Sequence, residues 1–177
     1  MMHHQSLLNR TVDWAVPAYL RLVHGLEALT PLFDLSVRLY LANIFWKGGL
    51  VKLSSWMSTV MLFTMVYDVP ILPPEIAAYL STAVELGGSF LLAIGLAGRW
   101  AALSLFGLNI VAALSYGQLS EAALQEAFYW GVLFLYLVLH GPGLISGDAL
   151  LRHLVRRRRA MSRDDGAVSK HTVLHSA

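Results

Sequence analysis

Four stretches of the chain are apolar over a length that crosses a bilayer, and polar turns separate them. They cover residues 35–53, 74–96, 100–116 and 127–145. A hydrocarbon core about 30 Å thick needs about 20 helical residues at a rise of 1.5 Å each. The pattern therefore predicts an all-α protein with four spans, folded as a membrane-spanning four-helix bundle.

Two more helices are predicted outside the spans. Residues 1–34 open with MMHHQ, which we expect to be unstructured, and then carry apolar residues at helical spacing: Val12, Val16, Tyr19, Val23 and Leu26. Such a stripe is typical of an amphipathic helix lying on a membrane, and equally of one packed on a partner or on the end of the bundle. Residues 54–73 hold an apolar run of 12 residues, too short to span, which predicts a short interfacial or re-entrant helix between the first two spans.

The basic residues predict the orientation. Between Lys52 and Arg152 only Arg99 is basic, so the two outer connections lack Lys and Arg. The positive-inside rule then places both termini and the turn at Arg99 in the cytoplasm. We expect a membrane domain over 35–152 and an Arg-rich cytoplasmic tail, partly disordered, over 153–177.

Composition agrees with a membrane protein and excludes several chemistries. Hydrophobic residues make up 56% of the chain, and the mean hydropathy is +0.58, which suits lipid better than water. The chain has no cysteine, which excludes disulfides, thiol redox chemistry and cysteine-bound iron–sulfur clusters. The sequence has no two histidines at matching depth that could ligate a haem, and it has no cluster of metal-ligating residues. We therefore predict neither haem nor a metal site.

The arginines of the tail have two open interpretations. The segment Arg152–Arg163 is basic enough to attract anionic lipid, at about 1 kcal/mol per charge near the surface. It serves equally well as a topology signal with no further role. Nucleic-acid binding is not expected, because the segment has no aromatic platform or recognition fold around it.

One acid, Glu85, stands at the middle of the predicted span 74–96. A charged residue at this depth costs about 2.5–3.5 kcal/mol on insertion scales, so it needs a reason. Small residues extend along the same face of the helix, and small residues allow close helix packing; they are Ala78, Ser81, Gly88, Ser89 and Gly95. We therefore expect Glu85 to point into the bundle.

Polar groups on neighbouring spans are the candidate partners of Glu85. Asn43 and Lys47 are four residues apart and share one face of the first span, and Asn109 is the polar interior residue of the third. Secondary candidates lie nearer the ends of the spans: Arg38, Lys52, Arg99, His140 and Asp148. Arg38 and Lys52 are interpreted as snorkelling to opposite interfaces. Two interpretations of Glu85 are open: a protonatable site that anchors a polar head such as a quinone ring, or an internal ion pair that fixes helix register.

With these residues and their order, the chain resembles the DoxX family of small four-helix membrane proteins. The resemblance rests on four motifs: RLYLANIFWKGGLVK with Gly49 and Lys52, VELGG with Glu85, the turn from Gly95 to Arg99, and HGPGLISGDALL with Asp148. Together they cover about 35–152, and the first helix and the tail lie outside.

The resemblance implies a place in the bacterial inner membrane and a protein partner in a membrane complex. It points first to an auxiliary subunit of a redox-linked system of the quinone or thiosulfate type, with a polar intramembrane site around Glu85. The alternatives are a quinone-binding oxidoreductase subunit in which Glu85 exchanges protons, and a small transporter or export partner for a metal-binding peptide or small molecule. Whether the chain is itself an enzyme is left open.

Overall fold

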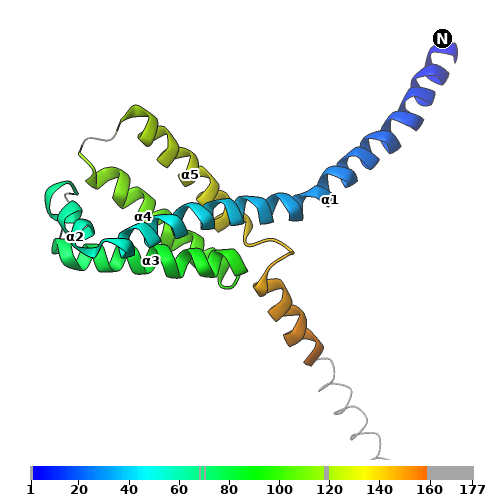
Figure 1. Ribbon diagram of the computed structural model, residues 1–177. Coiled ribbons are helices and arrows are strands. Elements are labelled where there is room, and N and C mark those ends of the chain that lie inside the picture. The colour runs from blue at the N-terminus through cyan, green and yellow to red at the C-terminus, as the bar shows by residue number, and fades with distance from the viewer. Residues whose placement is uncertain (1, 68, 70, 118–119, 159–177) are drawn as a thin grey trace, which may run out of the picture.

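The computed structural model describes residues 2–158 apart from 68, 70, 118 and 119, with side chains described from residue 16 onward. The described backbone is helical almost throughout (Figure 1). The elements in chain order are α1 (Met2–Ser54), α2 (Trp56–Met65), α3 (Pro74–Ile94), α4 (Gly98–Ser115) and α5 (Glu121–His140). A further helix covers 147–158. One β-bridge, between Tyr67 and Tyr116, joins the ends of α2 and α4.

Helix α1 is one continuous element where the sequence predicts two. It begins at Met2 instead of after an unstructured start, and it passes the predicted boundary at residue 34 without ending. Pro17 and Pro31 lie inside it. A proline in a helix removes one hydrogen bond and bends the axis, and α1 continues through both prolines. Figure 1 shows the result: α1 curves, and only its second half lies along the other helices.

The remaining helices follow the predicted pattern with shifted ends. Helix α2 corresponds to the short helix predicted between the first two spans, and α3 and α4 end within two residues of their predicted limits. Helix α5 begins six residues earlier than predicted, because the Ser120 hydroxyl accepts a hydrogen bond from the Ala123 amide at 3.2 Å and caps the first turn. It ends at His140, five residues early, because Gly141 adopts a positive φ of 97° and proline follows.

Three of the described helices, α3, α4 and α5, are long and apolar enough to cross a membrane. The second half of α1 is less apolar, since residues 35–53 include Arg38, Asn43, Lys47 and Lys52. The predicted tail falls largely beyond residue 158 and so lies outside the described residues.

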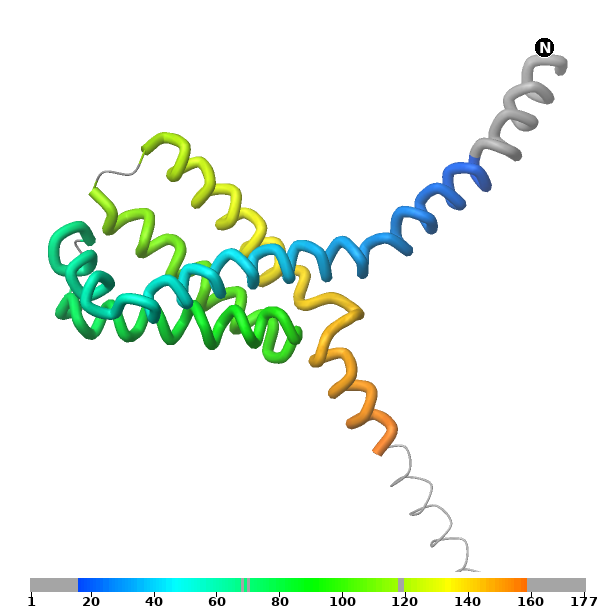
Figure 2. The backbone as a smooth tube through the Cα atoms, in the orientation of Figure 1, coloured from blue at the N-terminus to red at the C-terminus, as the bar shows by residue number. Residues whose placement is uncertain are grey.

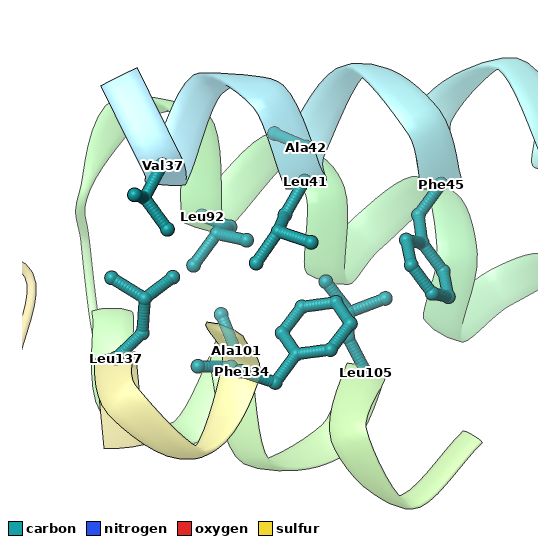
Figure 3. Close-up of a cluster of buried hydrophobic side chains, with 10 residues drawn as sticks. Val37, Leu41, Ala42, Phe45, Leu92, Ala101, Leu105, Phe134 and Leu137 are labelled. Atoms are coloured by element: carbon teal, nitrogen blue, oxygen red, sulfur yellow. The ribbon is translucent and has the colours of Figure 1, made fainter. Parts of the chain in front are cut away.

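The second half of α1 and helices α3, α4 and α5 share one apolar core (Figure 3). Its buried members come from all four helices: Val37, Leu41, Ala42, Phe45, Leu92, Ala101, Ala102, Leu105, Phe134 and Leu137. Three of the α1 members, Val37, Leu41 and Phe45, recur at intervals of four residues, which places them on one face of the helix. Figure 2 shows α1 beside α3, with the first half of α1 and the helix 147–158 both leaving the bundle at the same end.

Glycines set the distance between the helices that carry the site. A Cβ on Gly49 would lie 2.7 Å from the Leu86 side chain, and one on Gly88 would lie 3.0 Å from Leu105. Helix α3 therefore packs closely against α1 on one side and α4 on the other, as small residues allow.

Candidate functional site

Glu85 lies inside the bundle and forms an ion pair with Lys52. The Lys52 Nζ donates to Glu85 Oε1 at 2.6 Å, across the contact between α1 and α3. The two side chains are 17% and 12% exposed. Burial on this scale makes the pair costly to break, because removing one partner leaves an uncompensated charge.

The carboxylate of Glu85 has room because α1 carries a glycine beside it. A Cβ on Gly48 would lie 3.6 Å from both Glu85 oxygens, so the helix backbone approaches the carboxylate directly. Only one of these oxygens is used: Oε2 is buried and has no hydrogen-bond partner in the described part of the chain. A buried acceptor without a donor is unfavourable by about 1–3 kcal/mol. The site therefore offers an open acceptor next to a charged pair.

Lys52 reaches Glu85 from near the end of α1. Gly48 is level with Glu85, so Lys52 lies one helical turn further toward α2 and its side chain points back toward the middle of the bundle. Helix α2 folds over this region: the Thr59 hydroxyl donates to the Lys52 carbonyl at 2.9 Å, and Lys52 Nζ lies 5.8 Å from the centre of the Phe63 ring. Lys52 is thus an internal partner, which corrects the interpretation that it snorkels outward.

A cleft of about 410 Å³ opens beside the pair. Its walls are mainly apolar and aromatic, contributed by all five labelled helices and by the connection after α2; they include Phe45, Phe63, Val84, Leu103, Leu108 and Trp130. Polar groups lie at a few points along it, among them Lys52, Ser81, Glu85, Ser104, Asn109 and Ser115. Largely apolar walls with a few polar groups are typical of small-molecule sites, and the volume lies within their usual range.

Tyr67 adds a hydrogen-bond donor to the same cleft. It lies outside the long helices, after α2, and its ring meets Tyr116 edge to face at 5.3 Å. Burial raises the pKa of the Tyr67 phenol above its usual value, and the neighbouring Tyr116 and Glu85 raise it further. The phenol therefore keeps its proton at neutral pH.

Asn109 lies in the cleft, but no hydrogen bond joins it to Glu85. Its Nδ2 donates to the Ala127 carbonyl at 2.8 Å and so ties α4 to α5. Asn43 and Lys47 lie on the exposed face of α1. Lys47 is turned about 100° from Gly48 around the helix, so the face that meets Glu85 excludes it. The partner of Glu85 in the structure is thus Lys52, and not Asn43 or Lys47 as expected.

A second polar cluster closes the opposite end of the bundle. The Arg38 guanidinium is buried and donates to the carbonyls of Pro142 at 2.6 Å and Ile145 at 2.8 Å. Arg38 therefore binds backbone instead of snorkelling. Asp148 accepts hydrogen bonds from the amides of Ala97 and Gly98 at 2.8 and 3.0 Å, at the start of α4. Arg38 thus holds the chain after α5 against α1, and Asp148 holds it against the turn between α3 and α4.

Asp34 belongs to this cluster and was not singled out from the sequence. Its carboxylate is buried, accepts a hydrogen bond from the Tyr136 hydroxyl at 2.6 Å, and lies 3.6 Å from His140 Nε2. The signal was available, because Asp34 precedes Arg38 by four residues and so shares its helix face. Arg99 lies nearby, with Nη2 donating to the Leu139 carbonyl at 3.4 Å. The secondary candidates other than Lys52 thus gather at the end where the chain closes on itself.

Residues 33–118 match the sequence model of the DoxX family. These residues are a DoxX domain. The domain includes Lys52, Glu85, Asn109 and most of the cleft, and it ends before α5, so the Gly-Pro-Gly turn and Asp148 lie outside it. The chain thus carries a DoxX domain, and three helices of its described part are long and apolar enough to cross a membrane.

No curated protein and no solved structure matches the chain. In the part of the chain with described side chains, no three metal-ligating residues come together. The expectation that the protein holds no metal stays a prediction.

Proposed function

We propose that this DoxX protein is an auxiliary inner-membrane subunit of a redox-linked system, and that its cleft binds the head group of a lipid-soluble quinone. The observation that carries the proposal is the amphipathic cleft ending at an ion pair with one open acceptor, Glu85 Oε2. Apolar and aromatic walls suit a flat ring, and the polar end suits its oxygens.

The proposal includes four spans with both termini in the cytoplasm. The antiparallel packing of α1 on α3 supports residues 35–54 as the fourth span, since Arg38 lies beside Gly95 at one end and Gly48 beside Glu85 near the middle. The first half of α1 and the arginines of 147–158 leave the bundle at the same end, which is also the end of Arg99 (Figure 2). The positive-inside rule assigns this end to the cytoplasm.

The residues of the cleft fit both oxidation states of such a ring. The Lys52 ammonium and the Tyr67 hydroxyl are donors for a carbonyl oxygen, and Glu85 Oε2 is an acceptor for a hydroxyl. When bound, a quinone takes up two electrons and two protons as it becomes a quinol. In this arrangement Glu85 holds or releases a proton at Oε2 while Lys52 keeps Oε1 in place. The auxiliary role assigns the supply of electrons to a partner subunit.

Binding of a short-chain quinone to the purified full chain in detergent micelles tests the proposal. Trp130 lines the cleft, so its fluorescence reports a bound quinone by quenching. We expect saturable quenching in the wild type, and an affinity at least about tenfold lower in Glu85→Gln, which corresponds to about 1.4 kcal/mol. Glu75→Gln is the matched control, because Glu75 is an exposed acid at the start of the same helix.

The variant Trp130→Phe distinguishes quenching of Trp130 in the cleft from quenching of the other tryptophans. It should remove the quenching while the cleft stays intact. Quenching that is linear in quinone, or equal in the wild type and Glu85→Gln, would count against the site. Loss of helical content in Glu85→Gln with no binding in the wild type would support a purely structural ion pair instead.

A further inference from the structure

The outward face of α1 carries polar residues at membrane depth, unlike the outward faces of the other spans. Asn43 and Lys47 are both exposed. The exposed residues at the middle of α3, α4 and α5 are apolar or small; they include Leu80, Ala83, Gly87, Phe90, Gly107, Ile110, Val132 and Leu135. Only the α1 face is therefore mismatched to lipid among the described spans.

Lys47 lies near the middle of the span. Its neighbour Gly48 is level with Glu85 of α3, which stands about 16 Å from the first residue of that helix, in a helix about 31 Å long. A lysine facing lipid within the span is unfavourable by insertion scales, and the nearer end of α1, at Ser54, lies seven residues or about 10 Å away along the axis. In the described part of the chain no acid pairs with it. The described residues therefore supply no counter-charge for Lys47.

The spacing of the exposed face is that of a helix–helix seam. Six exposed residues recur at alternating intervals of four and three: Ser36, Tyr40, Asn43, Lys47, Leu50 and Ser54. This is the heptad pattern of positions that face a neighbouring helix in a coiled coil, and polar residues within such a seam fix its register. We call these six residues the Lys47 seam.

We propose that the Lys47 seam docks a transmembrane helix of a different protein, one that presents a carboxylate at mid-membrane depth. Charge complementarity selects this occupant. A second copy of the chain would have the same orientation in the membrane, so a two-fold pairing through the seam would place Lys47 against Lys47. The chain also lacks an exposed acid at this depth in its described spans. The proposal deepens the auxiliary-subunit part of the proposed function by assigning the face and the chemistry of the partner.

Designed transmembrane peptides supply a defined probe. The full-length protein and a labelled leucine–alanine peptide with a central Glu are reconstituted in liposomes, and association is measured by energy transfer against the same peptide with a central Leu. We expect the Glu peptide to bind the wild type at least tenfold more tightly than the Leu peptide. The difference should vanish in Lys47→Leu, and Lys47→Glu should prefer a peptide with a central Lys.

Ile110→Leu, on the outward face of α4, is the matched control and should leave the preference unchanged. Equal binding of the Glu and Leu peptides by the wild type would overturn the proposal. The proposal would also be overturned if the wild-type chain formed dimers in the same liposomes and Lys47→Leu abolished or strengthened these dimers. The occupant of the Lys47 seam would then be a second copy of the chain. Lys47 does not line the cleft. The peptide experiment therefore tests the docking proposal, the quinone titration tests the proposed function, and either proposal can be refuted without the other.

Discussion

Replacing Lys52 by methionine should be far more costly than replacing its partner. Lys52→Met leaves the Glu85 carboxylate about 16 Å along α3, beside Gly48 and away from either interface. Breaking a buried pair in this way costs about 3–5 kcal/mol. Glu85→Met leaves an ammonium two residues before the end of α1, where the side chain turns to the interface. We expect that variant to lose less than about 2 kcal/mol, within the range of one charged hydrogen bond.

The double variant Lys52→Met, Glu85→Met measures the coupling between the two residues. Replacing a buried ion pair by apolar residues of similar volume is often neutral or stabilising, so Lys52→Met with Glu85→Met should lie within about 1 kcal/mol of the wild type. The two substitutions should thus be coupled by about 3–6 kcal/mol, at or above the upper end for residues in contact.

Unfolding in mixed micelles with increasing sodium dodecyl sulfate, followed by far-ultraviolet circular dichroism, measures all four free energies. Lys47→Met is the matched control, because Lys47 is exposed on the same helix and should lose no stability. Equal costs for the two single variants that simply add in the double variant would refute both the ion pair and the reasoning on depth.

Two further predictions concern the turn after α3 and the outer end of the cleft. Gly95→Ala should cost about 2–4 kcal/mol, since Gly95 has a φ of +68° and a Cβ there would lie 2.6 Å from Arg38 Nη1; Gly87→Ala, with open space around it, should cost nothing in the same assay. The pKa of Tyr67 is raised in the folded state, so the unfolded chain loses that proton first and stability falls as pH rises above about 10. Tyr67→Phe should flatten that part of the pH profile, and an unchanged slope would contradict the burial of the phenol.

The sequence was sufficient to predict the helices and the direction of Glu85, because both depend on local periodicity. The small residues Ala78, Ser81 and Ser89 share a face with Glu85 and are buried with it. Hydropathy likewise located α3 and α4 within two residues. These features follow from one helix at a time and need no knowledge of its neighbours.

The partner of Glu85 could not be predicted in the same way. Depth along the chain favoured Lys47, but the face of α1 that meets α3 is decided by Gly48 and Gly49, whose missing side chains permit the close contact. The Lys52 side chain then extends back by one helical turn to Glu85. The spacing of residues in the sequence does not show this direction. The glycines were visible in the sequence as part of the GG pair, and they were the better guide to the buried face.

Helix α1 continues through the boundary predicted at residue 34 for a related reason. Asp34 is a polar interruption in the linear sequence, yet its carboxylate is buried and accepts a hydrogen bond from Tyr136, about a hundred residues later. Long-range hydrogen bonds of this kind allow an acid to continue a helix where hydropathy would end it.

The pairing of Lys52 with Glu85 also lowers the response of the bundle interior to a membrane potential. A membrane potential acts on a unit charge with about 2.3 kcal/mol per 100 mV across the whole bilayer. The paired charges are 2.6 Å apart, under a tenth of a core about 30 Å thick, so the same potential acts on the pair with at most about 0.2 kcal/mol. An unpaired Glu85 near the middle would feel about 1 kcal/mol. Because of the ion pair, a membrane potential therefore has little effect on the free energy of the charges inside the bundle.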